Sequence, residues 1–210
     1  MALDQLESAE SYYVMGVGTT GMGNNPNEDA LKELYERTRG SLDGYDDYLE
    51  RVLADDRETR RERILAEGNE NPVTPHSFEL ADISGNSMSS DVMDGKIVAI
   101  NFWGKWCGPC VAEMPDIQDL YEKYSDDDEV LILTINNDPI LSELIEWMEE
   151  HDYTFPTLRD DGYITTSGVS VFPTTWFLDR NGNIIYTQLG YTSELVEEFS
   201  WRIEELRNAR

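Results

Sequence analysis

The chain has 210 residues, 40% of them apolar, and its 43 acidic against 16 basic side chains give a formal net charge of −27. This balance excludes nucleic acid as a partner, because phosphates require a basic face, and it equally excludes an anionic membrane surface. The sequence contains no run of the ~18 apolar residues that a transmembrane helix needs, so no membrane span is predicted. The length suits one domain with an appendage, or two small domains.

The acidic side chains are spread along the whole sequence, and few lysines accompany them. The lysines are Lys32, Lys96, Lys105 and Lys123. Diffuse acidity with scarce lysine favours adaptation to high salt, where screening suppresses the self-repulsion of so many like charges. The alternative is an ordinary acidic protein.

The first third of the chain is typical of a helical segment. Apolar positions at helical spacing predict three helices, over 27–39, 42–53 and 56–66. Asn27 is the expected N-cap of the first. A glycine-rich stretch at 16–23 lacks the Lys-Ser/Thr of a phosphate-binding loop, so we expect a flexible turn there. The stretch 68–72 has linker composition, and we expect residues 1–70 to form a helical N-terminal segment of unknown role.

From Phe78 onward, strands and helices alternate, which predicts an α/β domain. The predicted strands are 78–80, 97–103, 130–135, 155–158, 174–178 and 184–188. The predicted helices span about 111–124, 140–151 and, capped by Ser193, up to 207. Asn181-Gly182 between the last two strands is a strong hairpin signal. The stretch 83–93 is polar and rich in turn-forming residues.

The only two cysteines, Cys107 and Cys110, are separated by Gly108-Pro109 and lie between the apolar strand 97–103 and a helix. A helix N-terminus carries partial positive charge and free N–H groups, so it favours a thiolate. Cys107 can attack a disulfide, and Cys110, one turn later, can resolve the mixed disulfide. This arrangement indicates thiol–disulfide exchange.

Other interpretations of the cysteine pair are weaker. A zinc site needs about four ligands, and the chain adds only the distant His76 and His151, so neither a metal nor another cofactor is predicted. A structural disulfide would close a very small ring with a modest entropic gain. Neither histidine lies in a motif that would make it a partner for cysteine catalysis.

Three motifs in order resemble the thioredoxin fold, and specifically its TlpA/ResA-like branch of thiol–disulfide oxidoreductases. They are Asn101-Phe102-Trp103-Gly104-Lys105-Trp106-Cys107-Gly108-Pro109-Cys110, Glu113-Met114-Pro115, and Val171-Phe172-Pro173-Thr174-Thr175 followed by Phe177-Leu178-Asp179-Arg180-Asn181-Gly182. The resemblance covers about residues 73–208. It implies an α/β domain over 73–210, with a central mixed sheet flanked by helices.

The resemblance also implies residues that bind the substrate. The family places a cis-proline opposite its cysteines, which matches Pro173, and the Phe172 peptide then faces an incoming chain. From sequence pattern alone, Pro173 would be an ordinary trans proline at a strand start. The expected substrate-binding set is Trp106, Gly108, Pro109, Phe172 and Pro173.

A further implied site residue is Glu113. Thioredoxin has a buried Asp at the position of Asn101, whereas TlpA/ResA-like proteins commonly have Asn there and a Glu that matches Glu113. A carboxyl withdrawn from water would have a raised pKa and could exchange protons with Cys110. The alternative is a surface Glu that only stabilises the first helical turn.

The sequence therefore predicts a thiol–disulfide oxidoreductase whose catalytic residues are Cys107, Cys110 and Glu113. Gly108-Pro109 accompanies reducing enzymes in the family, which implies a reductant of protein disulfides. The family resemblance alone implies a location outside the cytoplasm. We expect a monomer that receives electrons from an upstream thiol donor. Residues 1–5 do not look like the start of a signal peptide, so a cytoplasmic location is the alternative.

Two other functions stay open. One is a thiol peroxidase of thioredoxin fold, although such enzymes normally have threonine at the position of Gly104. The other is a non-catalytic module that binds a partner through residues 1–70.

Overall fold

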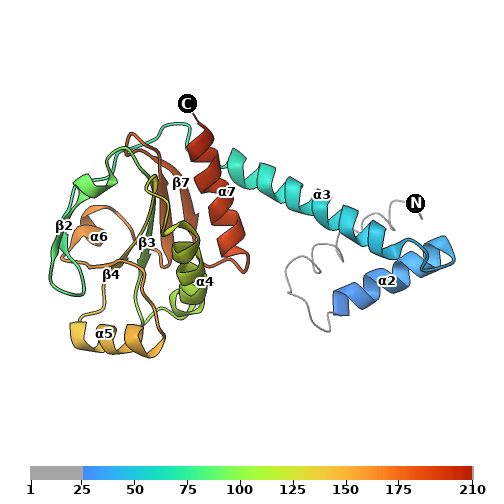
Figure 1. Cartoon of the computed structure of the whole chain (residues 1–210), viewed down its shortest axis with the longest axis horizontal. Helices are drawn as coiled ribbons and strands as arrows, with labels where there is room; N and C mark the ends of the chain where they lie inside the picture. The colour runs from blue at the N-terminus through green and yellow to red at the C-terminus, as the bar shows by residue number, and fades with distance from the viewer. Residues whose placement is uncertain (1–25, 210) are drawn as a thin grey trace. The chain divides into compact units, whose positions relative to one another are not determined.

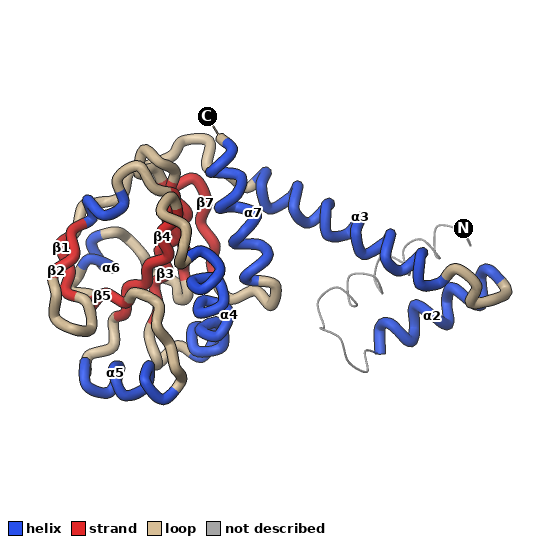
Figure 2. The backbone as a smooth tube through the Cα atoms, in the orientation of Figure 1, coloured by secondary structure: helices blue, strands red, loops and turns tan. Residues whose placement is uncertain are grey.

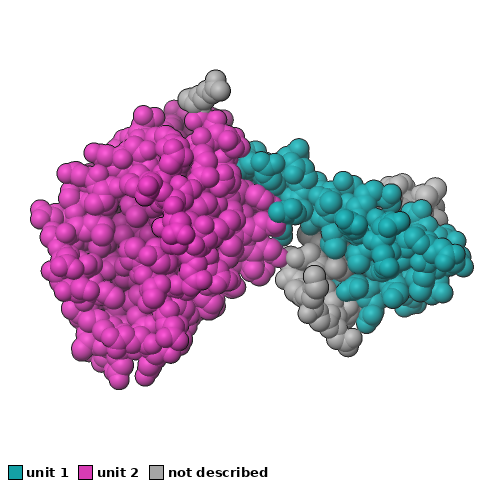
Figure 3. All heavy atoms as spheres, viewed as in Figure 1, with its two compact units in different colours: residues 1–66 teal, residues 67–210 magenta. Residues whose placement is uncertain are grey.

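A computed structural model describes residues 26–209, and the glycine-rich stretch 16–23 lies outside the described residues. The chain divides into two compact units, residues 1–66 and residues 67–210 (Figure 3). The larger unit contains the cysteine pair, and each unit is described by itself below.

In the first unit, helix α2 (Pro26–Arg39) and helix α3 (Tyr45–Ala66) form the described part. Their contact is aromatic, with a small buried cluster of Leu31, Tyr35, Tyr45 and Tyr48. The Tyr35 ring lies 4.8 Å from the Tyr48 ring and 5.3 Å from that of Tyr45. Such aromatic pairs stabilise a packed pair of helices beyond their buried area.

Two details of the helical prediction are wrong. The chain forms one helix, α3, where two were predicted over 42–53 and 56–66. The junction Ala54-Asp55 contains no glycine or proline, so nothing interrupts the hydrogen-bond ladder. Asn27 lies inside α2, because the helix already begins at Pro26, whose fixed φ suits a first helical position.

The second unit is built on a five-stranded mixed sheet in the order β5-β4-β3-β6-β7 (Figures 1 and 2). The strands are β3 (Ile97–Trp103), β4 (Val130–Asn136), β5 (Thr157–Arg159), β6 (Thr174–Leu178) and β7 (Ile184–Leu189). Strands β3, β4 and β5 are parallel, β6 runs antiparallel to β3, and β7 runs antiparallel to β6. This is the sheet that the resemblance implies, and the predicted hairpin joins β6 to β7.

Four helices accompany this sheet: α4 (Gly108–Tyr124), α5 (Leu141–Glu150), the short α6 (Tyr163–Thr166) and α7 (Leu195–Asn208). The predicted cap of α7 is wrong. The helix begins two residues after Ser193, whose hydroxyl donates to the Glu194 carboxylate at 3.2 Å. Ser193 therefore lies one position outside the N-cap, and its oxygen is not engaged by the helix N–H groups.

The strand predicted over 78–80 is observed as β1 (Glu79–Ala81), which pairs with β2 (Ser87–Ser89) in a small hairpin. Strand β2 and the 3₁₀ turn η1 (Ser90–Met93) lie in the stretch 83–93 that was predicted to be rich in turns. Strand β2 escaped prediction because Ser-Met-Ser is too short and too polar to show a strand pattern. The Asp82 carboxylate accepts N–H bonds from Ser84 and Asn86, which holds the connecting turn.

Strand β3 is buried along its whole length, and its carboxyl end leads directly into the cysteine motif. Val98, Ile100 and Phe102 belong to the apolar core on one face. On the other face Asn101 reaches α4, and Trp103 packs against Trp147 of α5 at 5.6 Å between ring centroids. A strand covered on both faces needs a continuous apolar run, and that run made it predictable.

Candidate active site

Cys107 and Cys110 are joined by a disulfide at the start of α4, with 5.2 Å between their Cα atoms. Cys107 is the N-cap of the helix in extended conformation, and its Sγ accepts the backbone N–H of Cys110 at 3.2 Å. Cys107 is 6% exposed and Cys110 is fully buried. A sulfur at a helix N-terminus is stabilised as thiolate, so the geometry favours Cys107 as the attacking sulfur. Gly108 and Pro109 form the first positions of α4, where a missing N–H costs nothing.

An aromatic pair, exposed Trp106 and partly buried Phe172, lies beside the disulfide. Trp106 is 60% exposed, and its ring meets that of Phe172 edge-on at 5.1 Å between centroids. The Trp106 indole N–H donates to the Asn137 side-chain oxygen at 2.9 Å. A Cβ at Gly104 would collide with that indole and lie 2.7 Å from Asn137 Oδ1, so glycine is required for Trp106 to occupy this place.

The loop after β4 holds the backbone in front of the cysteines. Asp138 is buried, and its carboxylate accepts the backbone N–H of Lys105 and the Asn136 amide, both at 2.8 Å. The Lys105 ammonium donates to the Glu143 carbonyl at 2.9 Å, so it turns towards α5. Asn137 and Asp138 were not predicted as site residues. The sequence feature that could have indicated them is their position, as polar residues that follow the carboxyl end of a strand parallel to β3.

The predicted proline loop lies on the neighbouring strand. The Phe172–Pro173 peptide bond is cis, as the resemblance implies. The next residue, Thr174, pairs with Phe102 of β3, so this loop and the cysteine motif leave the sheet at the same end. The Pro173 carbonyl accepts the N–H of Gly190 at 2.8 Å, which ties the loop after β7 to it.

Glu113 lies on the inner face of α4 and is fully buried. One carboxylate oxygen accepts from the Asn101 amide at 2.7 Å, and the same amide donates to the Thr175 hydroxyl at 2.9 Å. Burial raises the pKa of Glu113 from 4.5 to about 8; the Asn101 bond works against this shift and the nearby Asp116 adds to it. An acid with such a pKa can both give and take a proton near neutral pH. Its role at Cys110 stays a prediction.

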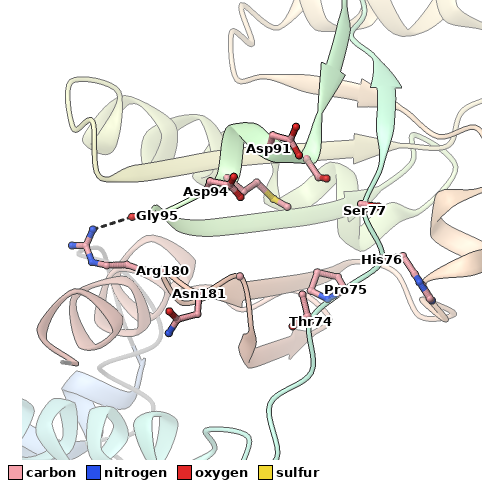
Figure 4. A pocket seen from close by; sticks show the side chains of 12 residues that line it. Thr74, Pro75, His76, Ser77, Asp91, Asp94, Gly95, Arg180 and Asn181 are labelled. Atoms are coloured by element: carbon pink, nitrogen blue, oxygen red, sulfur yellow. Dashed lines mark hydrogen bonds between the residues drawn. The ribbon is translucent and has the colours of Figure 1, made fainter.

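A separate pocket of about 410 Å³ lies at the opposite end of β3 from the disulfide (Figure 4). It lies between the segment with Pro75 and His76 and the β6–β7 turn with Arg180, whose guanidinium donates to the Gly95 carbonyl at 3.2 Å. It has no cysteine in its lining. Nowhere in residues 26–209 do three or more potential ligands gather into a metal site.

The chain is similar to known thiol–disulfide exchange proteins. The AhpC/TSA family model matches residues 73–187. The thiol-disulfide oxidoreductase ResA of Halalkalibacterium halodurans is 33% identical over 141 residues, which cover 66% of this chain and 78% of that protein. StoA from Bacillus subtilis is 27% identical, with a TM-score of 0.52, over 61% of this chain and 99% of the StoA chain.

A third relative is Etrx1 of Streptococcus pneumoniae strain TIGR4, described as an exposed lipoprotein thioredoxin. It is 26% identical, with a TM-score of 0.53, over 60% of this chain and 98% of its own.

None of the helices within 26–209 is long and apolar enough to cross a membrane.

Proposed function

Because the chain belongs to the AhpC/TSA family, as a TlpA/ResA-like thiol–disulfide oxidoreductase of the thioredoxin superfamily, we propose that it acts as a reductant of protein disulfides outside the cytoplasm. Protein thiols and disulfides are its substrates. The observation that carries the proposal is the disulfide at the N-terminus of α4, beside the aromatic pair Trp106–Phe172 and the loop at Pro173.

In the proposed reaction the reduced pair starts with Cys107 as thiolate. Its sulfur attacks one sulfur of the substrate disulfide, forms a mixed disulfide, and displaces a thiolate that takes up a proton. Cys110 then attacks Cys107, the Cys107–Cys110 bond forms, and the second substrate sulfur leaves with its electron pair. Two electrons thus pass to the substrate, its two thiolates take up protons from solvent, and an upstream thiol donor must restore the pair.

Glu113 is the proposed proton acceptor for Cys110. Cys110 is buried, so its thiol must lose its proton to a group inside the protein before it attacks. Glu113 is buried three residues further along the same helix. Its raised pKa, about 8, is close to that of an ordinary thiol, which makes transfer in either direction inexpensive.

The exposed surface around the disulfide suits an extended, partly apolar substrate chain. Exposed apolar side chains follow the proposed binding loops: Trp106, Val171, Leu189 and Tyr191. Leu189 pairs with Thr174 across β6 and β7, next to Pro173. We therefore add Leu189 and Tyr191, which the sequence analysis did not name, to the proposed substrate-binding residues.

The direction of electron flow is tested by the reduction potential of the Cys107–Cys110 pair. A potential near that of thioredoxin, about −270 mV, supports a reductant, and a potential near −120 mV would identify an oxidant. Catalysis is tested by insulin reduction with dithiothreitol. The Cys107→Ser variant should give only the uncatalysed rate, and a rate equal to that of the wild type would refute the proposal.

The peroxidase alternative meets a steric objection. A threonine in place of Gly104 would collide with the Trp106 indole and the Asn137 amide. The loop is therefore built around a hydrogen-bonded tryptophan rather than around the threonine expected of a peroxidase.

The proposed location and partners rest on the relatives. Etrx1 is described as an exposed lipoprotein, which supports an extracytoplasmic site of action. A monomer is proposed for the functional form. The helical segment within 1–70 is proposed as an accessory to the catalytic domain, with its deletion as the test: loss of activity towards a protein substrate, with activity towards a small disulfide retained, would indicate docking.

A further inference from the structure

The Glu113 side chain does not contact solvent, so a proton that it takes up must leave through a neighbouring group. It is fully buried, and the Asn101 amide occupies only one of its carboxylate oxygens. The other oxygen, Oε2, is buried without a hydrogen-bond partner among the described residues. An amide donor cannot accept a proton, so Asn101 offers no exit.

Asp116 provides the nearest acidic group on the same side of α4. It follows Glu113 by three residues, so both side chains lie on one helix face. Asp116 is only partly buried, and burial raises its pKa, while a bond from Tyr191 acts in the opposite direction. Its charge in turn raises the pKa of Glu113, which indicates that the two carboxyls interact.

Tyr191 holds Asp116 in position from the other side. The Tyr191 hydroxyl donates to Asp116 Oδ2 at 3.0 Å, and Tyr191 is 40% exposed. The preceding residue, Gly190, donates its N–H to the carbonyl of Pro173 at 2.8 Å. The loop that positions Asp116 is therefore attached to the proposed substrate-binding loop.

We propose that Asp116, held by Tyr191, is the positioning residue through which Glu113 exchanges its proton with solvent. The inference rests on the proposed role of Glu113. When Cys110 attacks the mixed disulfide, its S–H bond breaks and Glu113 takes the proton. No hydrogen bond joins the two carboxyls, so the proton passes from Glu113 to the Asp116 carboxylate through an intervening water molecule, and Asp116 releases it to solvent. The electron pair stays with the sulfur atoms, so this path carries protons only.

The titratable and polar groups around Glu113 are few, which makes the proposal testable. They are Asn101 of β3, Thr175 of β6, Asp116 of α4 and Tyr191 of the loop after β7. Near them, Asp119 acts on Asp116, and Glu194 acts on Tyr191. All of these further charges are negative, so they oppose ionisation. Tyr191 also reaches solvent, but its hydroxyl donates to Asp116, so Asp116 is the partly exposed carboxyl on the helix face of Glu113.

The test is the pH dependence of the rate at which the reduced protein reacts with a protein disulfide, measured on the full chain. Burial raises the pKa of Glu113 to about 8 in the oxidised protein, so the reduced wild type should show an inflection near pH 8 that Glu113→Gln removes. Asp116→Asn removes a neighbouring negative charge, so this inflection should move to lower pH by a few tenths of a unit or more. The limiting rate should fall about tenfold and should recover with added imidazole buffer, which can carry the proton instead.

Matched variants separate this inference from its premise. Asp126→Asn removes one exposed charge beyond the far end of α4 and should leave both the inflection and the buffer dependence unchanged. Tyr191→Phe should reproduce the slower, buffer-dependent rate. If Asp116→Asn gives the same profile as Asp126→Asn, the inference is overturned. If Glu113→Gln instead keeps the inflection near pH 8, the proposed role of Glu113 itself fails.

Discussion

The stability of the oxidised Glu113→Gln variant relative to the oxidised wild type should increase as the pH rises. Glutamine keeps the size of the side chain and an oxygen that can accept from Asn101, but it removes the proton equilibrium. The pKa of Glu113 is about 8 in the folded protein against an ordinary 4.5, because burial opposes its ionisation. The folded protein thus keeps a proton that the unfolded chain releases, and this favours unfolding as the pH rises.

The magnitude follows from the same shift. Below about pH 4.5 the carboxyl is protonated in both states, so wild-type stability is unaffected by this group. Between pH 4.5 and pH 8 the penalty increases steadily, to about 3 kcal/mol at pH 7, and above pH 8 it levels off at about 5 kcal/mol. The glutamine amide placed at the unpartnered oxygen position costs about 1–3 kcal/mol at every pH, so it shifts the curve without changing its slope.

The assay is urea unfolding of the oxidised wild type and Glu113→Gln between pH 5 and pH 9 at constant ionic strength. The disulfide keeps both cysteines from titrating, so they contribute no slope. Glu150→Gln, an exposed change on α5, is the control and should follow the wild type. A stability difference between Glu113→Gln and wild type that is the same at pH 5 and pH 9 would refute the reasoning, because Glu113 would then not titrate as a buried acid.

Two other properties should respond to simple changes. Gly104→Thr should slow insulin reduction and change the tryptophan fluorescence, because its Cβ displaces the Trp106 indole from Asn137; Asp126→Asn, an exposed change outside the site, is the control, and equal fluorescence in Gly104→Thr and wild type would contradict the steric argument. The melting temperature should rise substantially from low to multimolar potassium chloride, because screening weakens the repulsion among the excess negative charges; a melting temperature insensitive to salt would exclude adaptation to high salt.

The sequence was sufficient for the parts of the fold that have strong local patterns. The run Ile97–Trp103 is buried on both faces, so every position is apolar apart from Asn101, and its bounds were predicted correctly. The continuity of α3 was not predictable from apolar spacing, because its middle turn is charged and its helicity depends on the absence of a breaker. Strand β2 is defined by its pairing with β1, which no local pattern shows.

Some residues of the candidate site were likewise predictable from local sequence, and others depend on the tertiary fold. The cysteine pair lies in one contiguous motif, whereas the position of Glu113 at Asn101 depends on the packing of α4 against β3. Its burial was expected only because the motif resembles a family. Asn137 and Tyr191 come from loops after β4 and β7, and they reach the site through the order of strands in the sheet. Loop residues of this kind become visible only when the topology is known.

The net negative charge of the chain bears on Glu113, because negative charges and burial both raise the pKa of a carboxyl. A net charge of −27 opposes the ionisation of any carboxyl, but this long-range effect is screened over about 10 Å at 0.1 M salt and over about 3 Å at 1 M. The leading cause at Glu113 is burial, and the charge of Asp116 is a lesser one. Salt does not remove burial. The buried Glu113 therefore keeps a raised pKa in concentrated salt, whereas an exposed carboxyl whose pKa depends on neighbouring charges would lose its shift.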